Sequence, residues 1–215
     1  MNLRTLLKTM YLRVFPSYER ELERAIGDSK TVLDVGCGYP SPIRRFSKKF
    51  YSVGVDTYQP SIDKSKAEGI HNDYLNAQVL EIGERLSNES FECVLASDLI
   101  EHLTKEDGWK LLEMMERIAK RKVIVYTPNG FLPQGEVDGN AWQAHKSGWT
   151  PAEMIARGYT VIGVNGLKSL RGDFSLLKYK PTWWWRFVSD LTQKFLKRFP
   201  NSTFHMLCIK QIKLK

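Results

Sequence analysis

The sequence predicts an α/β protein in which a mostly parallel β-sheet is covered by helices on both faces. Short apolar runs alternate along the chain with segments of helical periodicity. One early run, Thr31 to Val35, passes directly into glycines, and a second run, Val53 to Val55, ends at Asp56. Strands that alternate with helices form parallel sheets with helices on both faces.

The N-terminal part of the chain is expected to begin with helices. Leucine, methionine and valine recur at helical spacing over residues 3–14, and a second helix is expected from about Ser17 to Gly27, a residue suited to end a helix. Between the two apolar runs, Ser41 to Phe50 is expected to form a helix. This gives a strand–turn–helix–strand unit.

The rest of the chain continues the alternation. Further strands are expected at 93–97, 123–127 and 160–164, further helices at 105–119 and 151–157, then an aromatic and basic helix at 182–199 and a last strand at 203–213.

Composition narrows the class of protein. At 215 residues the chain fits one domain, 1–215, and no signal peptide or membrane span is expected, which favours a cytoplasmic location. Three cysteines without metal-ligand spacing predict neither disulfides nor a metal site. The net charge of +8 resides in the tail, because nine Lys and Arg from Lys178 onward face one acid, Asp190. Such a tail suits nucleic acid, anionic lipid or an acidic substrate, and equally a solvated helix face.

The turn after the first strand is the strongest candidate for a ligand site. Gly36 and Gly38 permit a sharp turn and close approach of a ligand, and Asp34 precedes them at the strand end. A dinucleotide site needs a third glycine where this chain has Ser41, and an acid there repels phosphates but suits a cationic ligand. Asp56 lies at the interval at which an acid reaches a ribose hydroxyl.

The run Asp34-Val35-Gly36-Cys37-Gly38 and the later Glu101-His102-Leu103 resemble class I S-adenosylmethionine-dependent methyltransferases, in the small-molecule branch of methyltransferase type 11. The resemblance covers about residues 31–129. It implies a Rossmann-like fold with a seven-stranded sheet and an antiparallel last strand, S-adenosylmethionine as cofactor and S-adenosylhomocysteine as product. Residues 1–28 would supply N-terminal helices, 31–129 the cofactor core, and 130–215 the substrate side.

The resemblance also implies the cofactor residues. The acid and turn would hold the methionine moiety, the end of the second strand the ribose, an aspartate after the third strand the adenine, and the end of the fourth strand would lie beside the methyl donor. In this sequence these positions are Asp34, Gly36, Cys37, Gly38, Asp56, Thr57, Asp73, Ser97 and Asp98. Where many members have a further glycine, this chain has Pro40.

Two histidines are the candidate catalytic residues. Methyl transfer to a hydroxyl requires removal of a proton, and histidine is the natural base near neutral pH. His102 is the leading candidate, against a role in ordering its loop. His145 lies in a polar, aromatic loop expected to form a lid or a substrate wall. Glu101 is expected to organise the loop, and no cysteine nucleophile is expected.

Three functions remain open. The first is methylation of a small-molecule acceptor, including a lipid- or glycan-linked one. The second is methylation of RNA or protein, supported by the basic tail but by no RNA-binding module, so no nucleic acid partner is assigned. The third is a non-catalytic cofactor-binding module. The aromatic helix over 183–199 packs on the core or contacts a membrane surface, because tryptophan and lysine favour the lipid interface. The oligomeric state is not predicted.

Overall fold

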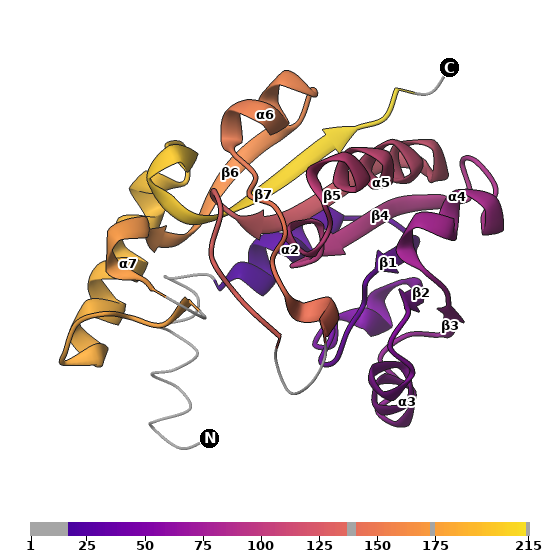
Figure 1. The fold of residues 1–215 in the computed structure, drawn as a ribbon, viewed down its shortest axis with the longest axis horizontal. Helices are drawn as coiled ribbons and strands as arrows, with labels where there is room; N and C mark the ends of the chain where they lie inside the picture. Colours follow the sequence, from indigo (N-terminus) through magenta and orange to yellow (C-terminus); the bar gives the residue numbers. More distant parts are fainter. Residues whose placement is uncertain (1–16, 137–140, 173–174, 214–215) are drawn as a thin grey trace.

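The computed structural model describes residues 17–136, 141–172 and 175–213 (Figure 1). The helix expected over 3–14 lies outside these residues.

One seven-stranded sheet forms the centre of the fold, with strand order β3-β2-β1-β4-β5-β7-β6. Neighbouring strands from β3 to β5 pair in parallel, and β7 pairs antiparallel with both β5 and β6. The mostly parallel sheet and the antiparallel last strand are therefore confirmed. The strands are β1 (Thr31–Val35), β2 (Tyr51–Asp56), β3 (Asp73–Asn76), β4 (Phe91–Ser97), β5 (Ala119–Pro128), β6 (Thr160–Leu167) and β7 (Thr203–Gln211).

Helices cover both faces of the sheet, as expected. On one face Leu111 and Met115 of α5 and Met154 of α6 join a buried apolar core, and on the other Leu22 and Ile26 of α2 join a second core. Figure 1 shows α7 beside the β6 edge and α3 at the opposite end near β3. The helices are α2 (Tyr18–Ile26), α3 (Gln59–Ala67), α4 (Ile82–Arg85), α5 (Lys105–Ile118), α6 (Pro151–Ala156) and α7 (Thr182–Leu196). No helix among these described residues is long and apolar enough to cross a membrane.

The helix expected over residues 41–50 is the main error of the sequence analysis. The segment forms turns and a single 3-10 helix, η1 (Ser47–Lys49). Pro40 and Pro42 remove two backbone N–H donors, and the Ser41 hydroxyl is held by Asp34 instead of capping a helix. Ile43 and Phe46 of this segment are nevertheless buried.

A buried tryptophan fixes the long connection between β5 and α6. Trp149 is fully buried, and its ring lies so close to Gly108 of α5 that a Cβ atom there would be 2.3 Å from it. The Trp149 Nε1–H donates to Ser147 Oγ at 3.0 Å, and the Lys105 ammonium lies 4.0 Å from the ring centroid. This packing attaches the connection to the sheet face that carries α5.

We predict that Trp149→Ala lowers the free energy of unfolding by about 3–5 kcal/mol, because it removes a large buried side chain that the rigid α5 backbone cannot replace. Chemical denaturation measures the change. Trp142→Ala in the same connection is the control, since Trp142 is 48% exposed and its loss should cost less than about 1 kcal/mol. Equal losses in the two variants would contradict the anchoring role.

Candidate active site

A cavity of about 960 Å³ opens at the carboxyl ends of β1, β2 and β4. Ligands bind at this edge in open parallel sheets, because the strand order reverses there between β1 and β4. Of the predicted site residues, eight line the cavity: Gly36, Cys37, Gly38, Asp56, Thr57, Ser97, Asp98 and His102. Asp34, Asp73 and His145 are not part of its lining.

The turn after β1 forms one wall of this cavity. Gly36 has a φ of +67°, and a Cβ atom there would lie 2.6 Å from a methyl carbon of Leu99. Glycine is therefore required both for the backbone conformation and for the space. The Cys37 amide donates to the Val55 carbonyl at 2.9 Å, and the Gly38 amide donates to an Asp56 carboxylate oxygen at 2.8 Å. These bonds hold the turn against the end of β2.

Asp56 presents its carboxylate at this wall. One oxygen accepts from the Gly38 amide, and the other accepts from the Tyr58 amide at 2.8 Å. Two backbone donors fix the orientation of the carboxylate, and each oxygen keeps a lone pair for a further donor. A pair of adjacent ribose hydroxyls supplies such donors, so the geometry suits the role predicted for Asp56.

The side chain of Asp34 does not face the cavity as expected, and its predicted role in cofactor binding stays a prediction. Its side chain is buried beneath the turn, where one carboxylate oxygen accepts from the Ser41 hydroxyl at 2.6 Å and lies 3.5 Å from His71 Nε2. Burial raises the pKa of the Asp34 carboxyl to about 7, with the Ser41 hydrogen bond opposing the shift and the nearby charge of Asp56 contributing to it. Asp34 supports the turn from below and does not face the cavity.

The position expected for Asp73 is wrong. Asp73 is the first residue of β3, whereas the ligand edge lies at the opposite end of that strand. The chain leaves β3 after Asn76, and Gln78 and Val79 then line the cavity. Asp73 was predicted because it is acidic. The strand β3 is short and contains few apolar residues, so the sequence did not indicate where it begins and ends.

The end of β4 carries the polar groups at the centre of the cavity. Asp98 follows β4 with a φ of +47°, a conformation that is uncommon for a residue with a side chain and that clusters at functional sites. Its side chain is 52% exposed toward the cavity, yet the surrounding protein raises the pKa of its carboxyl to about 7. Ser97 Oγ lies 2.8 Å from the hydroxyl of Tyr18, a cavity residue at the start of α2 that the sequence analysis missed.

The two predicted catalytic histidines lie together. Their ring centroids are 4.8 Å apart, with His102 in the 3-10 helix η3 (Ile100–His102) after β4 and His145 in the connection after β5. Burial, and to a smaller extent His145, lowers the pKa of His102 to about 4, and burial also lowers the pKa of His145. Both imidazoles are uncharged at neutral pH, and a group with a pKa of about 4 is a weak general base there. The base role remains a prediction that this electrostatic environment disfavours.

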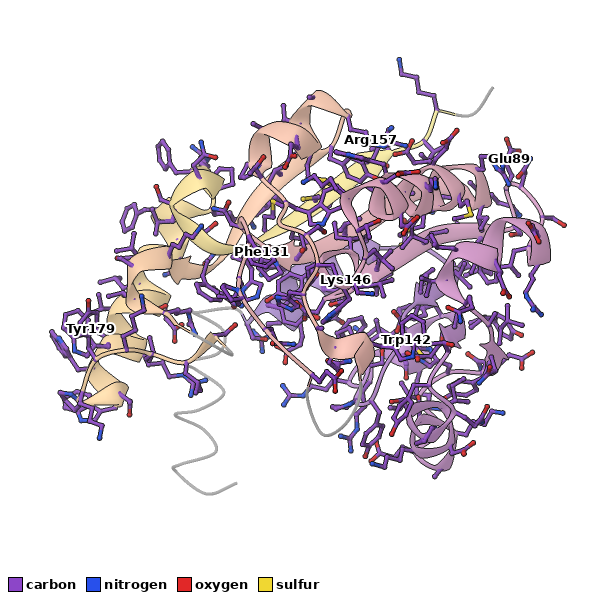
Figure 2. The ribbon with its side chains drawn as sticks, in the orientation of Figure 1. Glu89, Phe131, Trp142, Lys146, Arg157 and Tyr179 are labelled. Carbon is purple, nitrogen blue, oxygen red and sulfur yellow. The ribbon has the colours of Figure 1, made fainter. Side chains whose placement is uncertain are left out.

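The polar, aromatic loop forms a wall of the cavity. Trp142, Gln143 and Lys146 line it, and the Lys146 ammonium lies 5.8 Å from the centroid of the Trp142 ring. Figure 2 shows Trp142 and Lys146 on the segment that passes in front of the sheet. The Lys146 and Ser147 amides both donate to the Glu101 carbonyl, at 2.8 and 3.1 Å. The wall is therefore fixed to η3 by backbone hydrogen bonds.

None of the three cysteines is suited to act as a nucleophile. Cys37, Cys93 and Cys208 are all buried, and burial raises the pKa of each thiol, that of Cys93 to about 12. The reactive species of cysteine is the thiolate. The absence of a cysteine mechanism in the sequence analysis agrees with this environment.

Several solved structures with the same fold are methyltransferases. A S-adenosylmethionine-dependent methyltransferase from Archaeoglobus fulgidus superposes with a TM-score of 0.60 at 16% identity, over 95% of this chain and 99% of that chain. A S-adenosylmethionine-dependent methyltransferase from Aquifex aeolicus superposes with a TM-score of 0.54 at 15% identity, over 94% of this chain and 93% of that chain. The magnesium protoporphyrin IX methyltransferase of Synechocystis PCC 6803 with bound S-adenosylmethionine superposes with a TM-score of 0.51 at 13% identity, over 94% of this chain and 78% of that chain. At these identities the likeness shows the fold alone.

The strand order gives this chain the Rossmann-like fold of those methyltransferases. Residues 33–127 match the family model described as a methyltransferase domain, and no curated protein matches the sequence significantly. Over residues 33–127 the chain therefore resembles S-adenosylmethionine-dependent methyltransferases.

We predict that Asp34→Asn stabilises the protein without cofactor, increasingly as the pH rises. The Asp34 pKa in the folded state, about 7, is above that of an unfolded aspartate, near 4. Between these values the folded state binds more protons, so wild-type stability falls as the pH rises toward 7 and is then constant. The variant gap should reach on the order of 2–4 kcal/mol above pH 7. Urea denaturation at several pH values measures it.

His71, whose pKa burial lowers to about 4, is present in both proteins, so the comparison isolates the Asp34 carboxyl. A stability gap that does not change between pH 4 and pH 7 would contradict the burial of an ionisable Asp34.

Proposed function

We propose that this protein is a S-adenosylmethionine-dependent methyltransferase that transfers the methyl group to a hydroxyl oxygen of a small-molecule acceptor. The observation that carries the proposal is the single cavity that extends from the glycine turn to His102 and the 142–146 wall. Its volume of about 960 Å³ is at the upper end of the range for ligand pockets, roughly 300–1,000 Å³, so it has room for the cofactor and a small acceptor together.

The cofactor would occupy the end of the cavity formed by the turn. Gly36 and Gly38 allow the methionine moiety to approach the backbone, Asp56 is oriented to accept from the ribose hydroxyls, and Thr57 lies beside it. Gln78 and Val79 replace Asp73 as the residues beside the adenine. Ser97 and Asp98 would lie next to the sulfonium, whose positive charge the Asp98 carboxylate attracts.

The acceptor would occupy the end bounded by His102 and the loop wall. S-adenosylmethionine supplies an electrophilic methyl group. The acceptor oxygen forms the new O–C bond, the S–C bond breaks with its electron pair left on sulfur, and the hydroxyl proton is released to solvent. The chain holds donor and acceptor in line, and polar side chains at His102 and Asp98 orient the hydroxyl.

The basic tail supports an RNA substrate less than its composition suggests. Lys197 pairs with Glu21 at 2.6 Å and Lys210 pairs with Glu116 at 2.8 Å. Both basic groups are thereby partly neutralised by the protein itself. This observation favours the small-molecule acceptor over RNA.

We predict that cell extract incubated with methyl-labelled S-adenosylmethionine and the enzyme carries label in the low-molecular-weight or lipid fraction, as an O-methyl group identified by mass spectrometry. Asp56→Asn is the matched control. It keeps an oxygen for the Gly38 amide but loses the charge that binds the ribose, which should weaken cofactor binding by about 10-fold or more. Label confined to RNA or protein, or an N-methyl product, would contradict the proposal.

We also propose that α7 contacts a membrane surface and that the acceptor is amphipathic. Trp183 and Phe195 are each 71% exposed, and the helix also carries exposed Trp184, Phe187 and Leu191 next to Arg186. Aromatic and basic side chains together favour the lipid interface. A second cavity of about 820 Å³ lies along α7 and shares Tyr18 and Glu19 with the first. An apolar chain could follow this path from the membrane to the site.

We predict that the protein sediments with vesicles of phosphatidylcholine and phosphatidylserine, and that Trp183→Ala/Phe195→Ala lowers the bound fraction by about 10-fold or more, because two large side chains no longer enter the interface. Tyr51→Ala, an exposed aromatic on β2, is the control and should bind as the wild type does. Failure of the wild type to sediment would refute the membrane contact and leave the methyl transfer unaffected.

A further inference from the structure

A cluster of metal-ligand side chains borders the proposed acceptor position. Glu101, His102 and His145 each place one carboxylate oxygen or ring nitrogen so that the three atoms lie within 4.8 Å of one another. Two of the residues follow β4 in η3, and the third belongs to the connection after β5. The sequence analysis expected no metal site because the three cysteines lack metal-ligand spacing, and it did not consider these three residues together.

Backbone carbonyls determine which ring nitrogen carries the proton in both imidazoles. His102 Nδ1 lies 3.3 Å from the Ala144 carbonyl oxygen, and His145 Nδ1 lies 2.6 Å from that of Leu132. A carbonyl only accepts, so in each ring Nδ1 carries the proton and Nε2 presents a lone pair. Histidines that bind metals almost always have the second nitrogen held in this way, because the bond orients the ring and makes the ligand nitrogen more basic.

Glu101 brings a buried carboxyl group to the cluster. Its side chain is buried, and one oxygen accepts from the Thr127 hydroxyl at 2.9 Å. Over the described ranges, 17–136, 141–172 and 175–213, no ion pair joins Glu101 to a lysine or arginine. A buried carboxyl group can ionise where a metal ion compensates its charge, so this side chain is suited to be a metal ligand.

We propose that Glu101, His102 and His145 bind one divalent transition-metal ion. Two imidazole nitrogens and one carboxylate oxygen suit ions such as Zn²⁺ or Co²⁺ better than Mg²⁺ or Ca²⁺, which prefer oxygen ligands. Ligand atoms about 2.0–2.2 Å from one ion are about 3–4 Å apart, so the side chains need to close by only about 1 Å.

The role of this metal site in catalysis rests on the proposed function, methyl transfer to a hydroxyl oxygen. Three protein ligands leave coordination positions open, and His102 faces the cavity where the acceptor would lie. An acceptor hydroxyl bound at an open position would release its proton to water more readily. The acceptor is then an alcohol or phenol that coordinates through oxygen.

Calorimetric titration of untagged, chelator-treated protein with Zn²⁺ tests the site, and the visible absorption of bound Co²⁺ reports its coordination. The wild type should bind one ion. Glu101→Gln, His102→Asn and His145→Asn should each weaken binding by about 10-fold or more. Asparagine keeps a donor for the backbone carbonyl but removes Nε2, so these variants preserve the packing that holds the loop. His71→Asn, the same change at a buried histidine outside the cluster, should bind Zn²⁺ as the wild type does.

Wild-type affinity in the three folded variants, loss of binding in His71→Asn, or no Zn²⁺ binding by the wild type would overturn the proposal. Circular dichroism establishes folding of each variant. Methylation unchanged by chelator together with absent Zn²⁺ binding would overturn the metal site but leave the methyl transfer intact. Zn²⁺ binding by the cluster without O-methylation would leave the metal site intact and overturn the proposed reaction.

Discussion

The attachment of the 142–149 connection to the end of β4 is the constraint on which the acceptor side of the site depends. Two consecutive amides, from Lys146 and Ser147, donate to the Glu101 carbonyl, and the Ser147 hydroxyl donates to the Ile100 carbonyl at 3.2 Å. Trp149 then anchors the same connection on α5. A long loop has many conformations, and these few contacts select one in which His145 meets His102.

The cofactor side depends on a different arrangement, in which two acids support one turn from opposite sides. Asp34 lies beneath the turn and accepts from Ser41, whereas Asp56 lies at the cavity and accepts from the Gly38 amide. The buried acid fixes the segment that follows the turn, and the cavity acid fixes the glycines themselves. Aspartate therefore has two roles here. A buried aspartate holds the turn in place, and an aspartate at the cavity wall is available to a ligand.

The sequence predicts the sheet well because short apolar runs such as 93–97 and 123–127 are typical of strands that are buried on both faces of a parallel sheet. It fails where local chemistry outweighs periodicity. In the segment 41–50 the two prolines and the bond from Ser41 to Asp34 disfavour the expected helix.

In the candidate site, the glycine turn and the polar residues at the end of β4 could be predicted, because each is formed by residues that are adjacent in the sequence. Asp73 was misplaced because composition does not reveal which end of a four-residue strand an acid occupies. Tyr18 and the meeting of His145 with Glu101 arise from contacts between distant parts of the chain, for which a single sequence holds no signal.

Charge gives the two ends of the cavity different preferences. Asp56 and Asp98 face the end where the cofactor would lie, and Glu101 lies buried behind the acceptor end. S-adenosylmethionine carries a sulfonium charge that methyl transfer removes, so a wall of carboxylates attracts the cofactor more strongly than its neutral thioether product. The same electrostatic difference assists product release. At the acceptor end the neutral histidines lie beside the Glu101 carboxyl group, so the cluster is better suited to bind a metal than to act as a general base.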